Sequence, residues 1–130
     1  MIYIILILLT VLSGISKAIT DVSALNTIKD KLSQWGLGWW KKSYSSNNKY
    51  KNLDPAQGER FFLSTTLLVF LTDAWHLFGF LQELFMGIVI FMIAFNFSWK
   101  FALILFTCLY FLRQIVFELV YRYLKTKYNR

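Results

Sequence analysis

The chain is poor in the residues that catalytic and metal sites most often use. Among its 130 residues it has one cysteine, Cys108, one histidine, His76, and one proline, Pro55. A single cysteine excludes a disulfide framework within the chain, and no Cys/His pattern with metal-ligand spacing is present. The GxSxG, HExxH and Walker-type motifs are also absent, which removes the commoner hydrolase, metalloprotease and nucleotide-binding interpretations. We therefore expect neither a metal nor another cofactor.

Apolar residues are what the chain has in excess, at 57% of its length. A water-soluble protein of this size could not bury so much apolar surface. The apolar residues also form blocks, as membrane-spanning segments do. These blocks lie at Met1–Ile15, Phe61–Leu81, Leu84–Phe97 and Phe101–Tyr121. The sequence therefore predicts a single all-α integral membrane domain, residues 1–130, and we expect it in the inner membrane of a bacterium.

The formal net charge of the chain is +7. Its lysines flank the apolar blocks and do not form one long basic face, so nucleic acid is not the expected partner. Anionic lipid head groups explain the same charge more simply. We expect membrane lipids as partners, and leave open a homo-oligomer or a place in a larger membrane complex.

The order of the blocks predicts about four transmembrane helices. The expected spans are 1–20, 60–81, a short one at 84–99, and 101–123, with an interfacial amphipathic segment and a Trp-rich loop at 21–58 between the first two. A polar turn is expected at Gln82 and Glu83. An even number of spans places both termini on one side of the membrane, which we expect to be the inside.

The segment between the first two spans differs from the rest in composition. Apolar residues recur at helical spacing over Asp21–Gln34, which predicts a short amphipathic helix lying on the membrane. Next to it, Trp35, Trp39, Trp40 and Tyr44 beside Lys41 and Lys42 indicate an interfacial belt. Asp54 and Pro55 form a turn or helix-start signal, from which the second span is expected to begin.

Polar side chains interrupt the second predicted span. Asp73 and His76 are three residues apart, so on a helix they share a face with Thr72 and Thr65. Ionisable residues inside a membrane are costly and usually functional. A carboxylate beside an imidazole forms an acid–base pair, which makes Asp73 and His76 candidate catalytic residues. The alternative is structural, in which the pair hydrogen-bonds to neighbouring helices and stabilises the bundle.

Other polar residues lie near the ends of the predicted spans or along the last one. Converging near one membrane surface, they would suit a lipid or lipid-linked substrate, with a basic side chain holding a phosphate. The candidate substrate-binding residues are Lys17, Asp21, Ser64, Thr65, Thr72, Glu59, Arg60 and Arg113. Gln114, Glu118 and Arg122 continue the polar stripe of the last span, and the alternative for this set is a salt bridge that neutralises its charges.

Two stretches resemble a known family. The first stretch consists of Tyr50–Asn52, Asp54–Glu59, Ser64–Thr66 and the run TDAWHLF at Thr72–Phe78. The second is the N-terminal run Gly14–Ile19 with Asp21. Together they resemble a family of small membrane proteins from Bacteroidetes and their phages, over about residues 13–80. The resemblance implies a common architecture and marks Lys17, Asp21, Ser64, Thr65, Asp73 and His76. That family has no assigned activity, so no reaction follows.

A more distant similarity is to VanZ-like membrane proteins. These place an acid, a basic residue and a histidine within about one helical turn, and the similarity implies action on lipid head groups or lipid-linked sugars. This sequence departs from that pattern, because Ala74 and not a lysine follows Asp73. The leading hypothesis is therefore an enzyme acting on lipid or lipid-linked head groups through Asp73 and His76. The alternative is a non-catalytic membrane protein, either a small accessory subunit or a holin-like oligomer.

Overall fold

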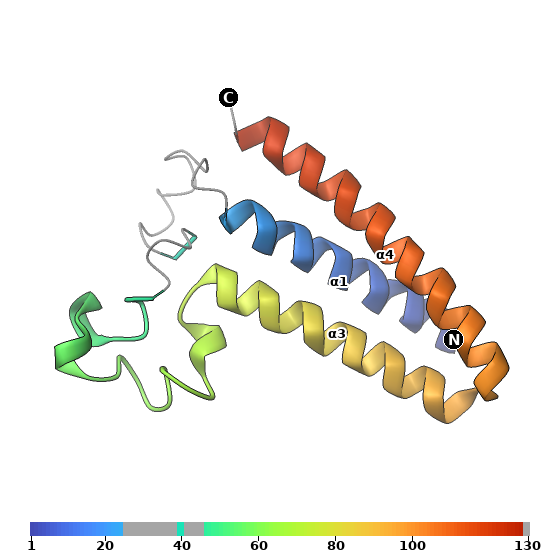
Figure 1. The fold of residues 1–130 in the computed structure, drawn as a ribbon, viewed down its shortest axis with the longest axis horizontal. Helices are drawn as coiled ribbons and strands as arrows, with labels where there is room; N and C mark the ends of the chain where they lie inside the picture. Colours follow the sequence, from blue (N-terminus) through green and yellow to red (C-terminus); the bar gives the residue numbers. More distant parts are fainter. Residues whose placement is uncertain (25–38, 41–45, 129–130) are drawn as a thin grey trace.

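The computed structural model describes residues 1–24, 39–40 and 46–128. Three long helices, α1 (Ile2–Ala24), α3 (Ala74–Asn96) and α4 (Trp99–Tyr128), form a bundle, and a loop projects from one end of it (Figure 1). Each of the three is long and apolar enough to cross a membrane. The described ranges contain no β-strand, only an isolated antiparallel bridge between Tyr50 and Glu59. The chain is therefore all-helical, with the character of an integral membrane protein.

The helix α1 lies between the other two. It packs along both α3 and α4, which contact each other much less and diverge from the turn that joins them (Figure 1). At that turn Phe97 stacks near Tyr3 of α1, with ring centroids 5.7 Å apart. The apolar core at this end of the bundle consists of Leu6, Val89, Ile93 and Leu109.

The contact of α1 with α4 depends on small residues. Thr10, Gly14 and Ala18 follow one another at intervals of four, so they share one face of α1, and all three are buried. A Cβ atom on Gly14 would lie 3.1 Å from the Cβ of Val116 on α4. Small residues let two helix backbones approach closely, which is a main source of packing energy between helices in a membrane. This face of α1 therefore sets how closely α4 can pack.

The structure corrects the prediction of four spans, since three such helices are present among the described residues. Residues 61–73, expected as the first half of a span at 60–81, form turns and the short 3₁₀ helix η4 (Val69–Leu71). The helix is prevented because Leu63 has a left-handed backbone (φ 58°) and side chains of Glu59 and Ser64 bind backbone N–H groups that a helix would use. The predicted span at 60–81 is therefore wrong.

The turn predicted at Gln82 and Glu83 is also wrong. The helix α3 runs through both residues, and so joins the end of the 60–81 block to the short span predicted at 84–99. Glutamine and glutamate are good helix formers, and the carbonyl of Gln82 accepts a hydrogen bond from Ser13 of α1 at 3.1 Å. An α-helix of 23 residues is about 34 Å long, which suits a bilayer without further residues.

With three such helices, the start of α1 and the end of α4 lie at opposite ends of the bundle (Figure 1). This differs from the expected placement of both termini on one side. The predicted helix at Asp21–Gln34 lies mostly outside the described residues, and Asp21 itself belongs to α1. Of the predicted interfacial belt, Trp39 and Trp40 are described, and the remaining residues lie outside the described ranges.

Candidate functional site

The side chains of Asp73 and His76 meet at the start of α3. Oδ2 of Asp73 lies 2.7 Å from Nδ1 of His76, and Oδ1 accepts a hydrogen bond from the backbone N–H of His76 at 3.0 Å. Asp73 has an extended backbone and is the N-cap of α3. Its side chain is 1% exposed, and that of His76 is 17% exposed. The pair therefore lies at one end of a membrane helix, and not within the span that the sequence predicted.

Thr72 completes the hydrogen bonding of this carboxylate. Its hydroxyl is 2.9 Å from Oδ2 of Asp73 and also 2.7 Å from the carbonyl oxygen of Val69. The backbone N–H of Ala74 lies at the helix start and so has no acceptor within α3. It donates to the carbonyl of Trp39 at 2.8 Å. Trp40 then stacks near Phe78 of α3 at 6.1 Å. Residues 39–40 are thus held against the first turns of α3.

The loop before η4 is organised around a hairpin-like pairing. Lys51 N–H donates to the carbonyl of Gly58 at 3.1 Å, and Arg60 N–H donates to the carbonyl of Lys49 at 2.8 Å. At the tip, Asp54 caps the 3₁₀ turn η3 (Pro55–Gln57), which follows η2 (Lys51–Leu53). The Asp54–Pro55 signal therefore marks a tight turn, and the helix expected to begin there does not form.

Ser64 fastens the hairpin to the residues that follow it. Its fully buried hydroxyl donates to the carbonyl of Lys49 at 2.7 Å and accepts from the N–H of Arg60 at 3.1 Å. Both of these bonds are to backbone groups. The geometry therefore gives Ser64 a structural task, and does not show it facing a substrate.

Glu59 and Thr65 form a second small cluster. The carboxylate of Glu59 accepts hydrogen bonds from the hydroxyl of Thr65 and from the backbone N–H of Leu63, the latter at 3.1 Å. The bond from the Thr65 hydroxyl is the main reason that the pKa of Glu59 lies below its ordinary value, while desolvation opposes this and backbone N–H donors add to it. The sequence predicted that Thr65 shares a helical face with Asp73 and His76. In the folded loop its hydroxyl instead donates a hydrogen bond to Glu59.

The remaining predicted residues lie along α1 and α4. Lys17 and Asp21 form an ion pair at 3.1 Å within α1, and the ammonium group of Lys17 lies 5.1 Å from the ring centroid of Phe117. Arg113 of α4 is 8% exposed, and its Nε donates to the hydroxyl of Ser13 at 3.0 Å. Arg113, Ser13 and the Gln82 carbonyl therefore form a polar link across all three helices. The predicted salt bridge is present between Arg122 and Glu118, at 2.5 Å.

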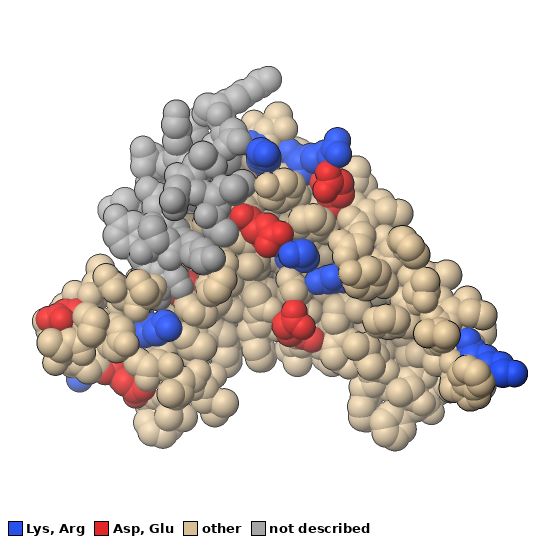
Figure 2. Space-filling model, viewed as in Figure 1, with Lys and Arg blue, Asp and Glu red and all other residues tan. Residues whose placement is uncertain are grey.

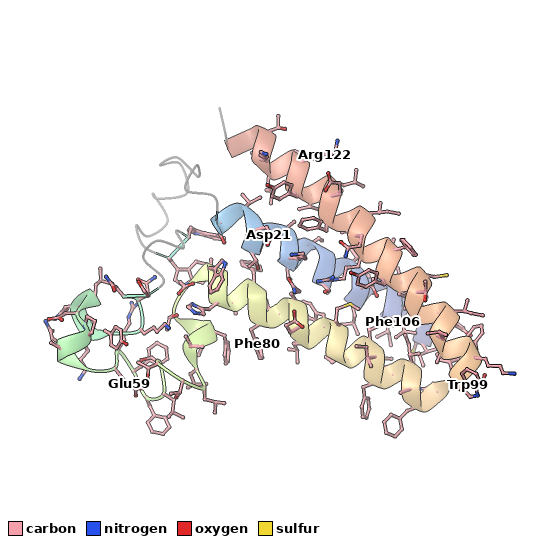
Figure 3. The ribbon with its side chains drawn as sticks, in the orientation of Figure 1. Asp21, Glu59, Phe80, Trp99, Phe106 and Arg122 are labelled. Atoms are coloured by element: carbon pink, nitrogen blue, oxygen red, sulfur yellow. The ribbon has the colours of Figure 1, made fainter. Side chains whose placement is uncertain are left out.

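The structure thus divides the predicted site residues among separate clusters. The first is Thr72, Asp73 and His76; the second is Glu59, Ser64 and Thr65 with the backbone of Arg60; the third is Lys17 with Asp21; and the fourth is Arg113 with Ser13. Figure 3 shows Glu59 in the loop and Asp21 on α1, well apart from each other. Figure 2 shows charges gathered over the loop and the C-terminal end of α4, with a short row over the middle of the bundle.

An open pocket lies beside the first cluster. It has a volume of about 410 Å³ and is lined by Trp39, Asn48, Tyr50, Asn52, Leu53, Arg60 and Thr72. Two predicted substrate-binding residues, Arg60 and Thr72, belong to this lining. The described part of the chain has no group of three or more His, Cys, Asp or Glu side chains that could hold a metal ion.

Sequence reasoning missed Ser13 and the pocket residues Asn48 and Asn52. Ser13 was detectable in principle, because it precedes Gly14 within the small-residue pattern of α1. The pocket residues carry no local signal, since the hairpin of residues 49–60 brings them together. Comparisons with protein-family models, with curated proteins and with solved structures give no match to this chain.

Proposed function

We propose that this chain is an integral membrane protein that acts on the head group of a lipid or lipid-linked molecule, with Asp73 and His76 as its acid–base pair. The observation that carries the proposal is the 2.7 Å contact between Asp73 Oδ2 and His76 Nδ1. A buried carboxylate that only accepts hydrogen bonds selects the tautomer with the proton on Nδ1. Nε2 is then the basic nitrogen that would accept a proton from water or a hydroxyl group.

The position of the pair supports a head-group substrate. Asp73 and His76 lie at the first turn of an apolar helix of 23 residues, where a membrane span meets the surface. On the neighbouring loop, Trp39 and Trp40 are residues typical of the membrane interface. A reaction at this level would reach polar head groups and not acyl chains. We also propose that the chain belongs to the family that it resembles, and that it lies in the inner membrane of a bacterium.

A second candidate is a non-catalytic membrane protein, an accessory subunit or an oligomer. The observation that favours it is that Asp73 has a sufficient structural task. Its carboxylate caps α3 by accepting from the His76 backbone, and it also accepts from the Thr72 hydroxyl. In this alternative the imidazole of His76 contributes to the cap and to packing near Trp75, 4.9 Å away.

The test is lipid turnover by protein reconstituted in nanodiscs with a total bacterial lipid extract, followed by mass spectrometry. Wild type is compared with His76→Asn, whose amide can still donate to Asp73, and with Asp73→Asn. We expect wild type to change one lipid class over time, and His76→Asn to slow that change by about 100-fold or more. Folded amounts are matched by size-exclusion chromatography and thermal melting.

Two results would contradict the enzyme. Either wild type leaves every lipid class unchanged, or His76→Asn changes lipids as fast as wild type does. If no lipid changes and Asp73→Ala lowers the melting temperature more than Asp73→Asn does, the non-catalytic candidate is the correct one.

A further inference from the structure

The pocket is lined by Thr72, by Trp39 and by residues of the loop between 48 and 60. Trp39 is held by the hydrogen bond from Ala74 N–H and by the edge of Trp40, whose ring centroid is 5.0 Å away. The lining also includes Arg60, whose backbone is fixed by Lys49 and Ser64. The volume of about 410 Å³ is within the range of pockets that hold small polar molecules.

The charges around this pocket favour an anion. Arg60 is exposed, and its guanidinium has no ion pair or hydrogen bond with the residues that the structure describes. None of the described residues that line the pocket carries a carboxylate. The acids nearby are already engaged, because Asp54 accepts from Ala56 N–H, Glu59 from Leu63 N–H, and Asp73 from His76. A guanidinium without a carboxylate partner is well suited to a phosphate group, which it binds through charge-assisted hydrogen bonds.

The uncharged part of the lining favours hydroxyl groups. Tyr50 carries a phenol that can both donate and accept a hydrogen bond, and the amide oxygen of Asn52 can accept one, while the amide nitrogen of Asn52 already donates to Gln57 at 2.8 Å. The indole of Trp39 offers a flat apolar surface against which the C–H face of a polyol would pack. A head group with an ammonium would find no carboxylate among the described lining residues and would lie near Arg60, which repels it.

We propose that this pocket binds a phosphate-bearing polyol head group, such as a glycerol phosphate or sugar phosphate, in preference to ethanolamine- or serine-containing head groups. Arg60 binds the phosphate, and Trp39 with Tyr50 contacts the polyol. This inference rests on the proposed function, because it names the substrate class of the same site. Thr72 joins the two, since it lines the pocket and also hydrogen-bonds Asp73, the partner of His76.

The test measures lipid retention by native mass spectrometry. The protein is placed in phosphatidylcholine nanodiscs containing equal amounts of phosphatidylglycerol, phosphatidylethanolamine and phosphatidylserine. We expect wild type to retain phosphatidylglycerol preferentially, and Arg60→Gln to retain it about tenfold less. Lys51→Gln is the matched control, because it removes the same charge from an exposed residue of the hairpin that does not line the pocket. It should bind as wild type does.

The proposal is overturned if Arg60→Gln retains phosphatidylglycerol as well as wild type, if Lys51→Gln loses it equally, or if phosphatidylserine is retained as strongly. Competition with soluble glycerol phosphate distinguishes the source. Displacement of the lipid assigns the site to a free phosphate ester, and retention of the lipid assigns it to a lipid head group. Both results support a polyol phosphate site when Arg60→Gln weakens binding as expected.

The two proposals fail in different ways. If His76→Asn binds phosphatidylglycerol selectively while wild type turns over no lipid, the enzymatic function fails and the binding site stands. If wild type turns over a lipid in a His76-dependent manner while Arg60→Gln changes neither binding nor turnover, only the pocket assignment fails.

Discussion

A Cβ atom added to Gly14 of α1 would lie 2.8 Å from the carbonyl oxygen of Arg113 on α4. The two helices therefore touch through backbone at this point, and Arg113 takes part in the contact twice. Its carbonyl borders Gly14, and its side chain binds the hydroxyl of the neighbouring Ser13.

Gly14→Ala should destabilise the bundle, although alanine is the better helix former. The added methyl group meets a backbone atom that cannot rotate away, so we expect the free energy of unfolding to fall by about 1–3 kcal/mol. Circular dichroism during an SDS titration measures the loss. Gly87→Ala is the control, because nothing lies within 4 Å of its added Cβ, and it should be neutral or stabilising. Equal effects at both positions would contradict the close contact.

Ser13→Ala should lower the free energy of unfolding by more than the replacement of an ordinary serine does. It leaves the Nε of Arg113 buried without a hydrogen bond, which typically costs about 1–3 kcal/mol. Arg113→Met removes the charge together with its need for a partner, so Ser13→Ala should cost much less in that background. A double-mutant cycle on unfolding free energies measures this coupling. Additive effects would show that the two side chains do not depend on each other.

Asp73→Ala and Asp73→Asn should separate the two tasks of this carboxylate. Asparagine still accepts from the backbone N–H of His76, so only the alanine variant loses the helix cap, at about 1 kcal/mol. The melting temperature reports this difference. ¹⁵N spectra of the single histidine report the tautomer, which we expect to carry its proton on Nδ1 in the wild type. Identical melting temperatures for the two variants would exclude a capping task.

Acid should loosen the loop at Glu59. Its pKa is lowered in the folded state, first by the Thr65 hydroxyl, so ionised Glu59 stabilises the loop above its ordinary pKa. That contribution is lost as the pH falls through the lowered value. Thr65→Val should move the pKa of Glu59 back toward its ordinary value, which ¹³C titration of the carboxyl carbon measures. Thr66→Val, on an exposed neighbour, should leave the pKa unchanged.

The loop should face the cytoplasm. Figure 1 shows the loop and the C-terminal end of α4 at one end of the bundle, and the turn between α3 and α4 at the other. By sequence, the loop contains Lys49, Lys51 and Arg60, the last turns of α4 contain Arg122 and Lys125, and the first turn of α4 contains Lys100. The positive-inside rule then places the N-terminus outside. In a Cys108→Ser background, an impermeant maleimide should label Ser98→Cys on intact cells and Ser46→Cys only after lysis. The reverse pattern would reverse the orientation.

The apolar blocks were sufficient to predict the helices now seen as α1 and α4, because long, predominantly apolar runs have few other structures in a membrane. They were insufficient between Phe61 and Thr72, which is as apolar as a span. What decides there is a set of side-chain hydrogen bonds from Glu59 and Ser64 to backbone N–H groups, which the apolar composition of the block does not reveal.

The candidate pair was predicted from the three-residue spacing of Asp73 and His76, and the two side chains do meet. Their setting was not predictable, because Asp73 precedes α3 as its cap and does not lie within a helix. Likewise, the sequence predicted a turn at Gln82. The carbonyl of Gln82 instead accepts a hydrogen bond from Ser13 of α1, and a contact between residues so distant in the sequence leaves no local signal. Spacing identified which residues pair, whereas tertiary contacts determined where helices begin and end.

The hydrogen bond from Ala74 to the carbonyl of Trp39 also constrains how the protein assembles. The first turn of α3 thus takes one of its hydrogen-bond acceptors from a residue that is distant in the sequence. We therefore expect the candidate site to be complete only when Trp39 lies against the start of α3. Variants that weaken the hydrogen bond between Ala74 and Trp39 should yield protein that is inserted in the membrane but lacks the complete candidate site.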